Sequence, residues 1–69
     1  MNDNLWISRL LNEKKELTVK TEKLVNFMDS VYFEYLSIED QNLLKLQLSV
    51  MKAYIEILKI RYDRIGKGD

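Results

Sequence analysis

The sequence of 69 residues contains no cysteine, no histidine and no proline, and each absence excludes a class of structure. Disulfides are impossible without cysteine, and the usual zinc ligands are missing as well. No proline interrupts a helix, and the two glycines, Gly66 and Gly68, stand at the C-terminal end. We therefore expect long helices without a metal or a cofactor, in a reducing compartment.

The chain also lacks an excess of either charge, because it has 11 Lys and Arg residues against 11 Asp and Glu residues. A protein that binds duplex nucleic acid normally carries a basic excess. No apolar run approaches the roughly 18 residues of a membrane span. The first residues also lack the charged and apolar regions of a signal peptide. We expect a cytoplasmic protein with no duplex nucleic-acid partner and no membrane.

The hydrophobic periodicity predicts two long helices, over about 4–28 and about 38–65, with a connection over 29–37. Together they form a single domain, 1–69. The fold class is all-α: an antiparallel two-helix hairpin with a short helical turn in its connection, assembled into a symmetric homo-oligomer.

The ends of these helices carry capping signals. Asn2 to Asn4 offer side-chain oxygens to the first turn of the first helix. Ser37 and Asp40 have the spacing of a capping box at the start of the second helix. The apolar residues between them, Val31 to Leu36, are expected to close the end of the hairpin.

The second helix has two apolar strips when its residues are placed at steps of 100°. The inner strip is a complete heptad seam made of Leu44, Leu48, Met51, Ile55, Leu58, Tyr62 and Ile65. The outer strip, on the opposite side, is made of Leu43, Leu46, Val50, Ala53, Ile57 and Ile60. The stripe of the first helix, built on Leu10, Leu17 and Leu24, is narrow and can cover only one strip. We expect the outer strip to be the interface of the homo-oligomer.

A polar line of Gln47, Tyr54 and Arg61, seven residues apart, separates these two strips. Cations near such a line could hold phosphates, and an aromatic ring could stack on a base. The candidate ligand-binding residues are Trp6, Arg9, Lys20, Lys23, Tyr54 and Arg61. The alternative is structural: Arg61 pairs with Glu13 to set the helix register, and Trp6 packs as core. The chain offers no histidine base, no cysteine nucleophile and no glycine-rich phosphate loop, so we expect no enzyme activity and no catalytic residue.

One pattern of residues covers nearly the whole chain. It consists of Arg9-Leu10, Glu13, Glu16-Leu17, Lys23-Leu24, Phe27-Met28, Phe33, Leu36-Ser37, Asp40-Gln41, Leu43-Leu44, Gln47-Leu48, Met51, Tyr54, Ile57-Leu58 and Arg61. This pattern resembles a group of small phage-encoded proteins related to a crAss-like phage protein. The resemblance implies an accessory phage protein that acts against host defence in the cytoplasm of the infected bacterium.

The expected architecture is also similar to that of phage sponge proteins, which are small helical proteins that form symmetric oligomers. Those proteins sequester the cyclic-nucleotide signals of CBASS or the cyclic ADP-ribose signals of Thoeris immunity. The similarity implies a non-catalytic binder of a small anionic nucleotide. Two alternatives stay open. One is a protein-interaction module that docks on a host protein and inhibits it, and the other is a purely structural oligomer.

Overall fold

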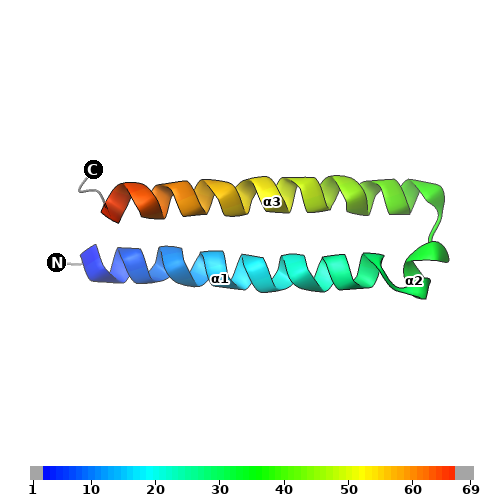
Figure 1. The fold of residues 1–69 in the computed structure, drawn as a ribbon, viewed down its shortest axis with the longest axis horizontal. Helices are drawn as coiled ribbons and strands as arrows, with labels where there is room; N and C mark the ends of the chain where they lie inside the picture. Colours follow the sequence, from blue (N-terminus) through cyan, green and yellow to red (C-terminus); the bar gives the residue numbers. More distant parts are fainter. Residues whose placement is uncertain (1–2, 67–69) are drawn as a thin grey trace.

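The computed structural model describes residues 3–66 and places them in three helices, α1 (Asp3–Met28), α2 (Val31–Glu34) and α3 (Ile38–Gly66). The predicted all-helical class is confirmed. Helices α1 and α3 lie side by side and run in opposite directions, and α2 lies at one end between them (Figure 1). The molecule measures 50 × 15 × 14 Å. Within the described helices, none is apolar over a stretch long enough to cross a membrane.

The start of α3 is fixed by side chains. The Ser37 hydroxyl accepts a hydrogen bond from the Asp40 amide at 3.1 Å, as the capping signal predicts. The Gln41 side-chain amide donates to the Leu36 carbonyl at 3.0 Å. Glu39 and Asp40 in the first turn and Arg64 in the last turn suit the helix dipole. The expected cap at the start of α1 lies outside the described part, because Asn2 and the side chain of Asn4 are not described.

The connection does not close the end of the molecule as broadly as its sequence predicts. Phe33 is buried, and its ring meets that of Phe27 edge-on, with centroids 6.4 Å apart. Tyr35, however, is 83% exposed, and Val31 and Tyr32 are exposed as well. The expectation is wrong for these three residues because α2 is a single helical turn, which can direct only one side toward the long helices.

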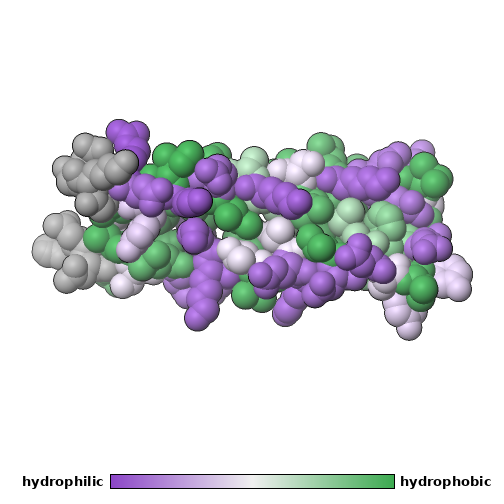
Figure 2. Space-filling view, in the orientation of Figure 1, coloured by the Kyte–Doolittle hydropathy of each residue, from purple (hydrophilic) through white to green (hydrophobic). Residues whose placement is uncertain are grey.

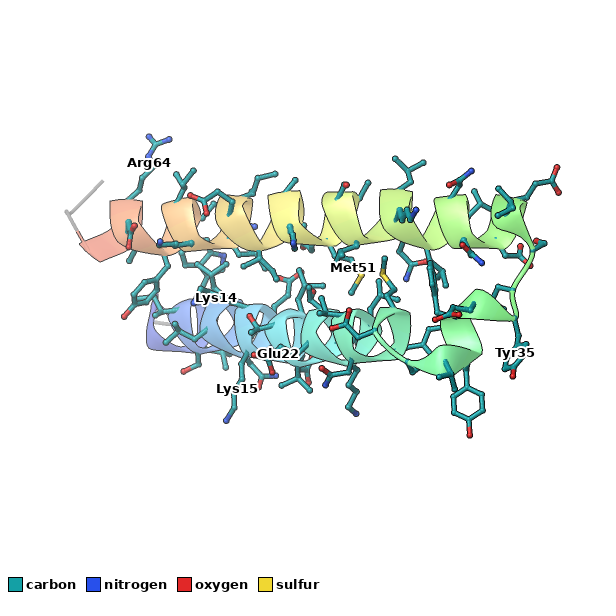
Figure 3. The ribbon with its side chains drawn as sticks, turned by 45° about the vertical axis from the view of Figure 1, so that its right-hand side comes forward. Lys14, Lys15, Glu22, Tyr35, Met51 and Arg64 are labelled. Carbon is teal, nitrogen blue, oxygen red and sulfur yellow. The ribbon has the colours of Figure 1, made fainter. Side chains whose placement is uncertain are left out.

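The core is thin and follows the inner strip. Leu58 is fully buried, at 0% exposure, and Leu10 of α1 is nearly so. Met51 points between the helices (Figure 3) and is half-buried. Thr21, the buried polar residue of α1, donates its hydroxyl hydrogen to the Leu17 carbonyl at 2.7 Å, so its burial leaves no unpaired donor. The core therefore depends on one line of contacts between α1 and α3.

The outer strip is uncovered. Its five large aliphatic side chains are between 49% and 62% exposed, and Ala53 is exposed too. Apolar groups interrupt the charged surface along the outer edge of α3 (Figure 2). Covering the exposed halves of five such side chains is worth roughly 4–8 kcal/mol. That amount approaches the whole free energy of unfolding of a small domain, about 5 kcal/mol or more.

We expect Leu58→Ala to lower the free energy of unfolding by about 2–5 kcal/mol, since it opens a cavity at the fully buried position of the thin core. Urea unfolding followed by circular dichroism, at one fixed protein concentration, measures the change. The control is Lys59→Ala, at the neighbouring exposed position, which should stay within about 0.5 kcal/mol. Equal losses in the two variants would contradict this account of the core.

Candidate functional site

Two contacts, seven residues apart on each helix, join α1 to α3 along the polar line. The Tyr54 hydroxyl donates a hydrogen bond to the Glu13 carboxylate. One heptad further along α3, the guanidinium carbon of Arg61 lies 5.9 Å from the centroid of the Trp6 ring, at cation–π distance. Trp6 is one heptad before Glu13, as expected for antiparallel helices in heptad register. The seven-residue spacing of the polar line is therefore matched by a seven-residue spacing on α1.

Tyr54 is held as a protonated donor. Its pKa lies above the ordinary value of 10.0, mainly because the hydrogen bond to Glu13 requires the phenol proton. Partial desolvation and the negative charge of Glu13 act in the same direction, whereas the positive charge of Arg61 opposes them. At neutral pH this side chain links the two long helices. Its stabilising effect is lost only as the pH rises above 10 and through the raised pKa.

A shallow depression of about 210 Å³ lies at the end of the molecule where α1 begins and α3 ends. Its lining residues are Trp6, Arg61, Arg64 and Ile65. The indole is 49% exposed, and none of these four lining residues is a carboxylate. The Arg61 guanidinium lies beside the indole, and Arg64 lines the same depression. Such a set suits an anion that also carries a planar base, because arginine binds phosphate and stacks on flat rings.

Arg64 is a member of this group that the sequence-based set omitted. Arg64 lies three residues after Arg61, so the two residues lie on neighbouring sides of α3. This spacing could have identified Arg64 as a candidate from the sequence. In Figure 3 its side chain projects from the side of α3 that faces away from α1.

The six predicted ligand-binding residues do not form one cluster within a single chain. Lys20 and Lys23 line a different depression, of about 410 Å³, which belongs to α1 alone and also includes Glu16. Lys20 is fourteen residues after Trp6, or about 21 Å along the helix. Arg9 is exposed on α1, about one turn from Trp6. In one chain the structure thus unites Trp6 with Arg61 and separates them from both lysines.

A register-setting contact of the structural alternative is present, although with another partner. Glu13 accepts a hydrogen bond from Tyr54, while Arg61, expected to pair with Glu13, lies over the indole. Trp6 is half exposed and is not a core residue. Within the described residues, no three acidic, histidine or cysteine side chains are grouped to hold a metal ion.

Comparison with known proteins gives one family. A family model described as Sequestin matches residues 4–64 of the chain. Neither the curated proteins nor the solved structures gave a match.

We expect Glu13→Ala to lower the pKa of Tyr54 toward its ordinary value, since the variant removes both the acceptor and the negative charge. The tyrosinate absorbance of each protein is titrated with alkali, and the curve of a Tyr54→Phe variant in the same background is subtracted to isolate Tyr54. Glu16→Ala, one turn further along α1, is the matched control and should leave the titration of Tyr54 unchanged. An unchanged pKa in Glu13→Ala would rule out this hydrogen bond.

Proposed function

The chain belongs to the Sequestin family, and we propose that it is a non-catalytic oligomeric binder that sequesters a small anionic nucleotide signal. The family name suggests a sequestering protein, and the chain's own chemistry suggests the ligand. The proposed ligand is a cyclic oligonucleotide or a signal of the cyclic ADP-ribose type. In this proposal the protein is an accessory phage protein that protects the phage from host defence in the cytoplasm of the infected cell.

The observation that carries the proposal is the depression formed by Trp6, Arg61 and Arg64. Arg61 and Arg64, which both line the depression, supply positive charge for phosphates. The exposed part of the indole and the plane of the Arg61 guanidinium, which the indole supports, offer flat surfaces for a base. Among the described residues that line the depression, none is a carboxylate.

Sequestration requires binding without bond cleavage. The chain has no histidine and no cysteine, and its described residues include no group of acidic side chains that could hold a metal ion. In this proposal the ligand is held intact and removed from solution in proportion to the amount of protein.

The exposed outer strip supports the oligomeric part of the proposal. Large exposed apolar surfaces on small soluble proteins mark interaction sites. A symmetric homo-oligomer joined through Leu43, Leu46, Val50, Ala53, Ile57 and Ile60 would carry one depression per copy. Several equivalent sites per assembly suit a protein that acts by stoichiometric capture.

A protein-interaction module is the second candidate, favoured by the exposed apolar residues at the other end of the molecule. Val31, Tyr32, Tyr35 and Ile38 are all more than 60% exposed. They could dock on a host protein and inhibit it. Purification from infected cells separates the two candidates, since a stoichiometric protein partner favours docking and a retained nucleotide favours sequestration.

We expect isothermal titration calorimetry to detect binding of at least one compound from a panel of cyclic dinucleotides, cyclic trinucleotides and cyclic ADP-ribose. The bound compound should be recovered unchanged after the protein is denatured by heat, which chromatography checks. If no compound of the panel binds, the proposed function is wrong. If the bound compound is recovered cleaved, the protein is not a non-catalytic binder.

We further expect Arg61→Ala to weaken that binding at least about tenfold, because it removes a charged partner of the phosphates. Lys45→Ala removes an equally exposed cation from the opposite half of α3 and is the matched control. Circular dichroism shows whether both variants stay helical. Equal affinities of the two variants would place the ligand elsewhere.

A further inference from the structure

The outer strip continues into a charged residue at each end. Glu39 lies four residues before Leu43, and Arg64 lies four residues after Ile60; both are exposed. The extended strip is Glu39, Leu43, Leu46, Val50, Ala53, Ile57, Ile60 and Arg64. Its steps alternate between four and three residues and read the same from both ends, so the strip is symmetric about a point between Val50 and Ala53.

We infer that the outer strip packs against the same strip of a second copy, antiparallel, about a two-fold axis at that point. This inference rests on the self-association in the proposed function and does not depend on its ligand. The register places Leu43 opposite Ile60, Leu46 opposite Ile57 and Val50 opposite Ala53. Because Ala53 is small, the two α3 helices can approach closely where they cross the axis.

Charge selects the antiparallel direction. The antiparallel register places Glu39 of each copy opposite Arg64 of the other, so opposite charges meet at both ends. A parallel register would place Glu39 opposite Glu39 and Arg64 opposite Arg64. Arg64 projects away from α1, on the side where a second copy would pack (Figure 3).

The shape of the surface also fits a second copy. The strip from Glu39 to Arg64 is about 37 Å long at the rise of an α-helix and covers most of the 50 Å length of the molecule. Near one end of the strip lies a largely apolar depression of about 390 Å³, lined by Phe27, Leu36, Asp40, Leu43 and Leu44. The antiparallel register directs Ile60 of the second copy toward it.

This dimer connects the interface to the candidate site. Arg61 and Arg64 line the depression beside Trp6, and the second copy would bring its Glu39 to the rim of that depression. A phosphate would therefore compete with the Glu39 carboxylate of the second copy for these arginines, twice per dimer.

Cysteine cross-linking tests the register, and the chain has no cysteine of its own to interfere. Leu43→Cys and Ile60→Cys are prepared separately and oxidised alone or mixed. We expect a disulfide dimer only from the mixture, since equal positions of two antiparallel strips lie about 26 Å apart, far beyond the roughly 7 Å limit for a disulfide. Cross-linking of either variant alone would overturn the antiparallel direction. Sedimentation of the unmodified chain and of the two variants, alone and mixed, measures whether each forms a dimer.

A charge exchange provides an independent test that leaves the apolar residues in place. Glu39→Arg should raise the dimer dissociation constant about tenfold at low salt, because it creates a like-charge pair at both ends. Adding Arg64→Glu should restore the original value to within about threefold, while Lys52→Glu, on the exposed charged side, is the matched control. No effect of Glu39→Arg, or no rescue by the double exchange, would overturn the register.

The outcomes separate this inference from the proposed function. The chain could form a dimer that neither cross-links between positions 43 and 60 nor responds to the charge exchange. In that case the proposed self-association stands, and this register is excluded. A chain that sediments as a monomer at micromolar concentration excludes both the register and the oligomer. Calorimetry of the cyclic nucleotides tests the ligand separately in every case.

Discussion

One helix cannot cover two opposite sides of its neighbour, and the rest of this structure follows from that constraint. Helix α3 has an apolar strip on each of two sides, and α1 covers the inner strip, where Leu58 is fully buried. The outer strip stays more than 49% exposed at Leu43, Leu46, Val50 and Ile57. Anything that covers the second side would stabilise the chain further, so folding and assembly would be coupled in the proposed oligomer.

The register between α1 and α3 is set by polar groups as well as by the core. Tyr54 bonds to Glu13, and one heptad away Arg61 lies over Trp6. These contacts lie between the inner and outer strips, and the second of them also lines the depression that we propose as the nucleotide site. The same register therefore aligns the core and positions the arginine and indole for a ligand.

Periodicity was sufficient to predict the helical class and the exposure of the outer strip, because both depend on spacing along one helix. The Ser37 cap was predictable for the same reason. The antiparallel arrangement places both Tyr54 and Arg61 near Glu13, but the 100° pattern does not decide between them, and Glu13 bonds to Tyr54. The lysines Lys20 and Lys23 were grouped with Trp6 by charge, although the helical rise separates them. Arg64 was missed because it does not belong to the seven-residue spacing of Gln47, Tyr54 and Arg61.

The placement of the two chain ends has a practical consequence for experiments. Helix α1 begins and α3 ends at the end of the molecule that holds Trp6, Arg61 and Arg64 (Figure 1). An affinity tag or a fluorescent protein fused to either terminus would emerge beside these residues and could block or mimic an anionic ligand. Helix α2 lies at the opposite end. A dye attached at the exposed position of Tyr32 would lie far from that depression and would leave it open to a ligand.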